Sequence, residues 1–489
     1  MFAVTAAETG ETTPATSPTA AKRWWRAVVI FLLVAVLIGA GLFWRVQTRV
    51  SVAPAPAVAQ HKALVVPLGS GTEGSAADTV AAEATAAAAG VDTAALRAQV
   101  AEIMDAAAGD SGFGRLHAQV RDAATGEVLW SSRAEAPATP ASSLKVFTAA
   151  AVLLGMDPDK RVRTEVLTVP GSRDIVIRGA GDPTLSRGGA GFFPGAASIA
   201  DLAAQIRRAR PEGVGAVRVD ASLFPEVFHP TWEQAGMAEG NIAPVVPVML
   251  DAGRLDPTGV NSPRSPRPAE DVAEALAQQL GGTAAGLAKP GATERGQVLA
   301  AVDSAPLQVR VREMMLHSDN VLAESLAREL AIARGLPPTF AGAAQAVRDT
   351  LAEHGFRMKG AVMADTSGLS PDNRVSATQL AEILALAAAP YQPEVLAPER
   401  AALISRLRPL LDALPVAGVS GTLDDRFAGA AGAGVVRAKT GTLDRVSALA
   451  GYVATDSGAI LSFALLSNDA NLLPARAAAD RVASALAEI

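Results

Sequence analysis

The sequence predicts an α+β fold, in which helices cover a sheet whose strands come from both ends of the folded region. Two strand-like runs near residue 120 are joined by a short polar turn, and three more lie between 435 and 466. Helix-forming apolar runs occupy much of the interval between these two groups. Strands from both ends with helices between them favour a mixed α+β domain. With 489 residues, 49% of them hydrophobic, the chain is long enough for two or more packed units.

The N-terminal part carries targeting signals rather than a folding pattern. An apolar run at 27–44 follows a basic cluster at 22–26 and has tryptophans at both edges, which predicts a single transmembrane helix. Residues 1–26 are then a cytoplasmic tail, and the rest of the chain lies outside the cytoplasm. A cleaved signal peptide is the alternative, and it would make the protein secreted. Residues 45–92 are rich in Ala, Pro, Gly, Ser and Thr and predict a flexible linker.

The folded region is predicted to begin near Thr93 with a helix, since apolar residues recur there at helical spacing. A β-hairpin at 116–120 and 128–130 follows. Pro140 ends the next loop, and Ser142 opens a core-buried helix. Toward the C-terminus we expect strands at 435–439, 448–453 and 460–466, and a closing helix at 475–489.

A long insertion interrupts this domain. The interval between Ser142 and Ser318, two residues of the motifs described below, is far longer than one helical subdomain needs. Strand-like runs with many glycines and prolines predict a β-rich inserted region at 165–298. The main domain is therefore predicted to be discontinuous, at 93–164 and 299–489.

Three short motifs occur in a fixed order along the chain. They are Ser142-Ser143-Leu144-Lys145, Ser318-Asp319-Asn320 and Lys439-Thr440-Gly441-Thr442. They match the S-x-x-K, S-x-N and K-T-G elements of serine acyltransferases that attack D-alanyl-D-alanine or a β-lactam. By chance, such a chain would contain roughly one or two S-x-x-K strings, about one S-x-N and about a tenth of a K-T-G. Lysine is scarce in this chain, so two lysines in the required strings favour a functional set.

Ser142 and Lys145 are the predicted nucleophile and general base. At positions i and i+3 of a helix they share a face, so the amine reaches the hydroxyl. The helix N-terminus adds backbone N–H groups and a positive dipole end. Lys145 must be neutral to accept the proton, so its pKa must fall from about 10.4 towards 7. Burial and a second positive charge both act in that direction. On these two residues alone, an N-cap serine beside a solvated lysine is the alternative.

The K-T-G element is predicted to bind the substrate. Lys439 is the candidate second charge, and we expect it to hold the anionic end of the substrate with Thr440 and Thr442. Gly441 lets the substrate backbone approach the strand closely. Taken alone, the element also fits an exposed edge-strand lysine followed by a turn.

Ser318 and Asn320 lie just before an apolar helical run at 321–326. In acyl transfer Ser318 relays a proton to the leaving amine, and Asn320 hydrogen-bonds the substrate amide and Lys145. In isolation the alternative is a helix cap by Ser318 or Asp319. The oxyanion hole is predicted to consist of the backbone N–H groups of Ser142 and Thr442, because such a donor is typically worth about 3 kcal/mol.

Other chemistries find no support in the sequence. Zero cysteines exclude disulfides, thiolate metal sites and a cysteine nucleophile. The chain has no H-E-x-x-H string, no G-x-S-x-G elbow and no Walker loop, so we expect no metal and no cofactor. The net charge is -6 and the sequence shows no basic face, so it does not predict binding to nucleic acid. His317 adjoins the S-x-N motif, and we expect it to be a surface or supporting residue.

With these residues in place, the chain resembles the D-alanyl-D-alanine carboxypeptidase/endopeptidase family, the low-molecular-mass penicillin-binding proteins with inserted domains. The likeness extends over about 94–489. Besides the three motifs it includes landmark strings at 181–185, 365–370, 414–418 and 421–423.

The resemblance implies a β-lactamase/transpeptidase-like domain, with an antiparallel sheet flanked by helices and a helical subdomain. It implies a serine peptidase, without a metal, that acts on peptidoglycan stem peptides through an acyl-enzyme on Ser142 and is inhibited covalently by β-lactams. The insertion of this chain looks shorter and richer in loops than that of the family. Glu233 lies where an acidic residue of such an insertion would contact a stem peptide.

Two alternatives to a DD-peptidase stay open. A β-lactamase would turn over β-lactams rapidly, and the long insertion argues against it. A catalytically idle wall-binding protein of the same fold is opposed by the intact motif residues. The choice between carboxypeptidase and endopeptidase is not determined, because both activities break the same kind of bond.

Overall fold

The computed structural model describes residues 92–489 except 190, 290, 293 and 295. The predicted tail at 1–26 and transmembrane helix at 27–44 lie outside the described residues, as does nearly all of the predicted linker. Among the helices in the described part of the chain, none is both long enough and apolar enough to span a membrane.

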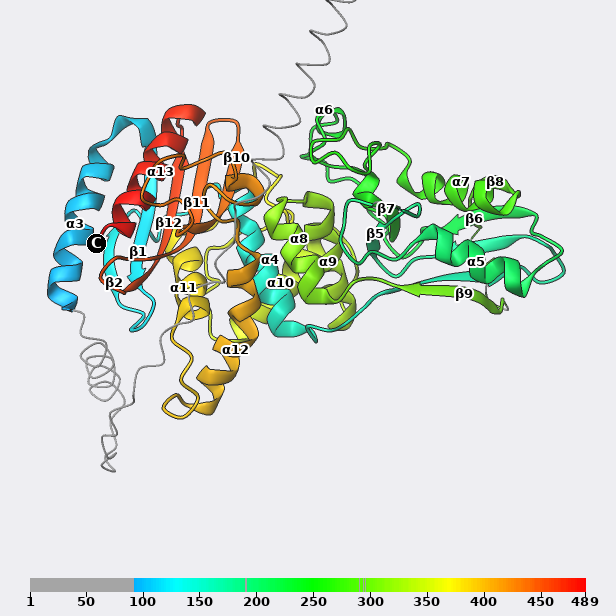
Figure 1. Cartoon of the computed structure of the whole chain (residues 1–489), viewed down its shortest axis with the longest axis horizontal. Coiled ribbons are helices and arrows are strands. Elements are labelled where there is room, and N and C mark those ends of the chain that lie inside the picture. The colour runs from blue at the N-terminus through cyan, green and yellow to red at the C-terminus, as the bar shows by residue number, and fades with distance from the viewer. Residues whose placement is uncertain (1–91, 190, 290, 293, 295) are drawn as a thin grey trace, which may run out of the picture. The chain divides into compact units, whose positions relative to one another are not determined.

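A five-stranded antiparallel sheet combines strands from both ends of the folded region, as predicted (Figure 1). Its order is β10-β11-β12-β1-β2, and the predicted hairpin is present as β1 and β2. The three C-terminal strands follow the expected positions, but β10 continues through the whole K-T-G element instead of turning after Lys439. The bounds are β1 (Arg115–Asp122), β2 (Val128–Ser132), β10 (Arg437–Leu443), β11 (Val446–Ala454) and β12 (Ile460–Asn468).

Helices cover both faces of this sheet. The helices α3 (Thr93–Gly109) and α13 (Leu472–Ala487) share one apolar core with Phe463 of β12. The next residue, Ala464, faces the opposite core, to which α11 (Ala377–Ala388) contributes. Since successive side chains of a strand alternate between faces, the sheet separates two cores.

A second group of helices surrounds α4 (Lys145–Gly155), the helix that follows Ser142. All residues of α4 from Lys145 to Leu154 are buried, which explains why its sequence is almost entirely apolar. The helices in contact with it include α8 (Leu307–Leu316), α9 (Asn320–Ala333), α10 (Phe340–Glu353) and α12 (Pro398–Ala413).

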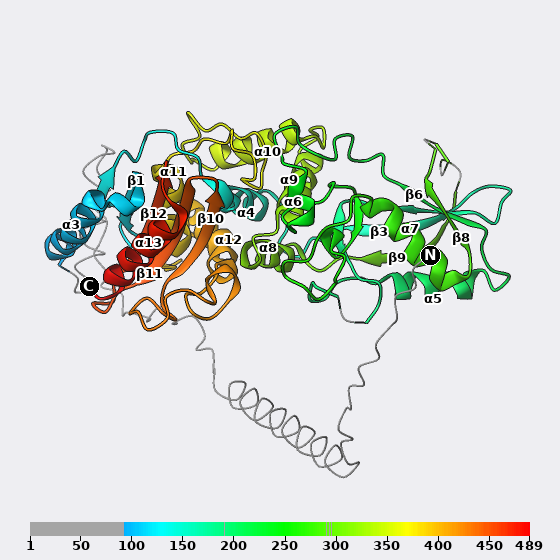
Figure 2. The same cartoon turned by 90° about the horizontal axis from the view of Figure 1, so that it is seen from above.

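The insertion forms a second five-stranded sheet, in the order β8-β6-β4-β3-β9 (Figure 2). Three of its strands match the predicted runs, but two helices make the region mixed rather than β-rich. The apolar side chains of α5 are buried at helical spacing against the sheet, but this pattern is short and lies between strand-like runs in the sequence. The bounds are β3 (Arg163–Thr168), β4 (Ile175–Arg178), α5 (Ile199–Ala209), β6 (Ala216–Asp220), α7 (Pro268–Leu280), β8 (Thr283–Leu287) and β9 (Val298–Asp303).

Smaller elements connect the insertion to the rest of the chain. A two-stranded parallel sheet joins β5 (Asp182–Leu185) and β7 (Val248–Leu250), and a single helical turn forms α6 (Ala235–Ala238). A loop at 254–267 leads from β7 and the short 3-10 turn after it to α7. These connections bring the insertion against the N-terminus of α9, where the S-x-N motif lies.

Candidate active site

Ser142 lies in a 3-10 turn, Ala141–Leu144, that leads directly into α4. Its hydroxyl caps no helix, so the N-cap alternative does not describe it. Lys145 is the first residue of α4, and its Nζ donates to Ser142 Oγ at 3.0 Å. The predicted i, i+3 contact between nucleophile and base is therefore present.

Lys145 is completely buried and donates to two more acceptors. Its Nζ lies 2.6 Å from Asn320 Oδ1 and 2.6 Å from the carbonyl oxygen of Ser367. The amine is thus held at one position by three oxygens from three separate segments of the chain. The predicted hydrogen bond between Asn320 and Lys145 is among them.

Burial lowers the pKa of Lys145 to about 8. The prediction that burial depresses this pKa is correct in direction, although the value stays above 7. Nearby carboxylates favour the charged amine and limit the shift. They belong to Asp365, Asp319 and Glu324.

Lys439 is also buried, and its Nζ donates to Ser318 Oγ at 2.9 Å and to the carbonyl oxygen of Thr440 at 2.9 Å. Burial lowers the pKa of Lys439 well below its usual range, and the charge of Lys145 lowers it further. Burial is thus the main cause of the lowered pKa of both lysines, and the predicted repulsion between them lowers the pKa of Lys439 rather than that of Lys145. Lys439 is not among the residues that line the cleft, and its contact with the anionic end of the substrate stays a prediction.

Ser318 and Asn320 point toward the two lysines, while Asp319 between them caps a helix. Asp319 Oδ1 accepts from the backbone N–H of Leu322, so the cap alternative is true of Asp319 alone. Ser318 has a φ of +53°, in the left-handed region that non-glycine residues rarely adopt. The motif is therefore a strained link that presents one side chain to each lysine.

Thr440 and Thr442 line the cleft from the edge strand β10. The Thr440 hydroxyl lies 2.8 Å from that of Thr422, and Arg476 of α13 donates to Thr442 Oγ1 at 2.9 Å. A side chain at Gly441 would come within 2.7 Å of the Pro140 carbonyl oxygen, so this glycine also lets β10 approach the turn that carries Ser142.

The loop at 365–370 is a functional segment that the sequence marked only as a family landmark. Gly368 has a φ of +83°, and a side chain there would meet the Ala141 carbonyl oxygen at 2.0 Å. Beneath the loop, Glu324 accepts from the backbone N–H groups of Thr366 at 3.0 Å and Ser367 at 2.8 Å. Burial, followed by the charge of Asp365, raises the pKa of Glu324 to about 7. These contacts fix the loop so that the Ser367 carbonyl oxygen accepts the hydrogen bond from Lys145 Nζ.

A cleft of about 1160 Å³ opens over these residues. Ser142 and Thr442, the predicted oxyanion pair, both line it, as do Ser318 and Asn320. Glu233 lines it from the insertion. Within the described part of the chain, no group of His, Asp and Glu side chains is arranged to hold a metal ion.

The contact of Ser142 with the buried Lys145, opposed by the Lys439–Ser318 pair, is the arrangement expected of a serine acyltransferase. The model of the D-Ala-D-Ala carboxypeptidase 3 (S13) family matches residues 96–263 and 259–488. The chain belongs to this family, and the predicted class of D-Ala-D-Ala carboxypeptidase is confirmed.

Named relatives and a solved structure agree with this assignment. Carboxypeptidase DacB of Mycolicibacterium smegmatis is 44% identical over 402 residues, 80% of this chain and 84% of that protein. A carboxypeptidase of Mycobacterium tuberculosis is 43% identical over 430 residues, 86% of each chain. The crystal structure of penicillin binding protein 4 from Haemophilus influenzae superposes with a TM-score of 0.62 at 20% identity, over 81% of this chain and 98% of that one. The fold is therefore the mixed α+β fold of that penicillin-binding protein.

Proposed function

We propose that this protein hydrolyses the D-Ala-D-Ala bond of peptidoglycan stem peptides through an acyl-enzyme on Ser142, and that β-lactams acylate the same serine. One observation carries the proposal: the buried Nζ of Lys145 lies 3.0 Å from Ser142 Oγ. Burial lowers the pKa of this amine to about 8, so a substantial fraction is neutral near physiological pH.

Acylation begins when neutral Lys145 takes the proton from Ser142 Oγ. The oxygen attacks the carbonyl carbon of the penultimate D-alanine, and the N–H groups of Ser142 and Thr442 receive the oxyanion. The C–N bond then breaks, and the leaving amine takes a proton. Ser318, held by a hydrogen bond from Lys439 Nζ at 2.9 Å, relays that proton: its hydroxyl gives its own proton to the amine and regains the one that Lys145 took from Ser142. Lys145 is then neutral again. Water releases the product by attack on the ester, with Lys145 again as the base.

The domain and membrane assignments belong to the same proposal. Residues 93–164 and 299–489 form the discontinuous catalytic domain, and the insertion at 165–298 supplies one wall of the cleft, including Glu233. The apolar run at 27–44 tethers the enzyme to the membrane, with the catalytic domain on the extracytoplasmic side, where stem peptides are found.

Release of D-alanine tests the proposal. The protein is incubated with a pentapeptide ending in D-Ala-D-Ala and, in parallel, with the same peptide ending in D-Ala-L-Ala, and the freed amino acid is measured. We expect release from the first peptide only, together with a stable penicilloyl adduct after treatment with penicillin G. Rapid hydrolysis of penicillin without peptide cleavage would point to a β-lactamase, and inertness toward both would point to an idle wall-binding protein.

Arg476 is expected to bind the terminal carboxylate of the substrate, because it lines the cleft beside Thr442 while Lys439 is buried. Among the described residues Arg476 forms no ion pair of its own. Hydrogen bonds to charged groups contribute about 1.5 to 3 kcal/mol, so Arg476→Gln should raise KM for stem peptides about 10- to 100-fold with little change in kcat. Arg481→Gln, on the same helix but paired with Asp110, is the control. An unchanged KM in Arg476→Gln would place the carboxylate elsewhere.

A further inference from the structure

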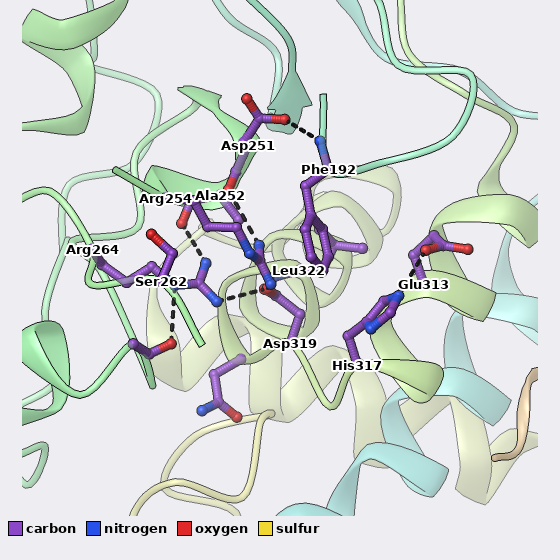
Figure 3. Close-up of polar contacts among 12 residues, drawn as sticks. Phe192, Asp251, Ala252, Arg254, Ser262, Arg264, Glu313, His317, Asp319 and Leu322 are labelled. Carbon is purple, nitrogen blue, oxygen red and sulfur yellow. Dashed lines mark hydrogen bonds and ion pairs between the residues drawn. The ribbon is translucent and has the colours of Figure 1, made fainter. Parts of the chain in front are cut away.

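The insertion contacts the S-x-N motif through a buried cluster that the mechanism above does not use. Arg254 and Arg264, both from the insertion, form ion pairs with the same oxygen, Oδ2 of Asp319, at 3.0 Å and 3.1 Å, and Arg264 also donates a hydrogen bond to it (Figure 3). All three side chains are buried: the exposed fraction is 1% for Arg254, 3% for Arg264 and 0% for Asp319. We call this Arg254–Asp319–Arg264 group the arginine clamp.

Each arginine of the clamp is itself fixed by the insertion. Arg264 donates to the carbonyl oxygens of Gly240 at 2.9 Å and Ala252 at 2.7 Å, so its guanidinium has one orientation. The guanidinium of Arg254 stacks on the ring of Phe192, 3.5 Å from its centroid. The two arginines are also paired across an isolated antiparallel bridge.

The backbone just before Arg254 has a strained conformation, which directs the Arg254 side chain toward Asp319. Asp251 and Ala252 have φ values of +47° and +55°, both left-handed. The Asp251 carboxylate accepts from the backbone N–H of Phe192 at 2.8 Å, and the Asp251 carbonyl accepts from Arg254 at 3.2 Å (Figure 3). Strain of this kind persists only where surrounding contacts determine the conformation, and it is concentrated at functional sites.

The same insertion also contacts the residues on either side of the clamped aspartate. Asn320 Nδ2 donates to the carbonyl oxygen of Asn241 at 2.9 Å, which turns Oδ1 of the same amide toward Lys145 Nζ. The ring of Phe192 packs edge-on against His317, with centroids 4.8 Å apart (Figure 3). The insertion therefore contacts the residue before the left-handed Ser318 and the two residues after it.

We propose that Arg254 and Arg264 are positioning residues for catalysis: by holding Asp319, they place Ser318 against Lys439 and Asn320 against Lys145. This inference rests on the proposed function. It assigns the insertion a role in the chemistry itself, in addition to forming a wall of the cleft. The arginines act through Asp319 and need not touch the substrate.

The decisive variant is Asp319→Asn, which keeps the side-chain oxygen that caps α9 but removes the charge that both arginines bind. A displacement of about 1 Å in a catalytic group costs about 100-fold in rate. We therefore expect kcat for D-Ala release and the rate constant of penicillin acylation to fall about 100-fold, with KM changed less than about threefold. Arg264→Lys keeps the charge without the planar fork, and it should lose about 10-fold.

Active-site titration with penicillin separates positioning from mere stabilisation. If the clamp positions the motif, all molecules of the folded variant acquire an adduct, but slowly. If the clamp only stabilises the fold, part of the sample stays unlabelled and the remainder reacts at the wild-type rate, which would overturn the inference. Should Asp319→Asn not fold, Arg264→Lys decides in the same assay, and a folded Arg264→Lys with wild-type kcat also overturns it.

Two controls complete the experiment. Arg267→Met removes an exposed arginine of the insertion that pairs with Glu274 at 3.7 Å, and its kcat should stay within about twofold of wild type. Wild-type protein is assayed in the same series. Failure of the wild type to acylate or to release D-alanine would contradict the proposed function, whereas an active wild type with equally active clamp variants would contradict only this inference.

Discussion

Replacement of Ser142 by alanine should abolish labelling by penicillin G and lower kcat for D-Ala release by about 10⁶-fold. The reason is that Ser142 Oγ is the hydroxyl oxygen in contact with Lys145 Nζ, at 3.0 Å. Without it no acyl-enzyme forms, and the rest of the site has no covalent step to accelerate. Intact-mass spectrometry of the protein after penicillin treatment, alongside a D-alanine release assay, measures both effects.

Ser143 provides the matched control, since it lies in the same 3-10 turn. Its hydroxyl donates to the Pro140 carbonyl oxygen at 2.7 Å, whereas the hydrogen bonds of Lys145 and Lys439 go to other residues. Ser143→Ala should keep the adduct and lose only about 1 kcal/mol of stability, as expected for one hydrogen bond. An adduct on Ser142→Ala protein, or its absence from Ser143→Ala protein that is folded, would contradict the assignment of the nucleophile.

The main sheet could be predicted from the sequence because each of its strands is a short run of apolar or alternating apolar and polar residues, bounded by residues typical of turns. The hairpin of β1 and β2 illustrates this, since a local pattern is sufficient to define both strands. The helices of the insertion could not be recognised in the same way. Their apolar faces are short. These segments pack as helices against a sheet in which β3 pairs with β9, a strand far away in the sequence, and no local pattern reports that packing.

The catalytic residues could be predicted because S-x-x-K, S-x-N and K-T-G report chemistry directly. The residues that support them carry no such local signal. Ser367 acts through its backbone carbonyl, and Arg254 meets Asp319 only in the folded chain. The complete burial of Lys439 has the same origin, because it follows from tertiary packing and not from the K-T-G string. The string 365–370 is a family landmark, and its glycine is the one local feature from which a close backbone approach could have been predicted.

Lys145→Arg is expected to reduce the rate of acylation by about 10²- to 10⁴-fold, the usual contribution of a general base. Arginine keeps the positive charge but cannot be deprotonated, so the variant separates proton transfer from electrostatic support. Its guanidinium must also fit a completely buried position, so Lys145→Met, which is neutral and of similar length, serves as a second variant with the same expected loss. Lys359→Arg, at an exposed position, is the control and should be unaffected.

The pH profile gives the sharper test of the same prediction. Burial lowers the pKa of Lys145 to about 8, so the amine is mostly protonated below this pH and mostly neutral above it. The second-order rate constant of penicillin acylation should therefore rise with pH through about 8 and then level off. Stopped-flow measurements between about pH 6 and 10 should show this limb for wild type and Lys359→Arg. Lys145→Arg should not show it, because its group does not titrate there. A wild-type profile that is flat through this interval, or a limb that persists in Lys145→Arg, would assign the base to another group. Such a result would leave Lys145 only the task of holding Ser142, Asn320 and the Ser367 carbonyl in place.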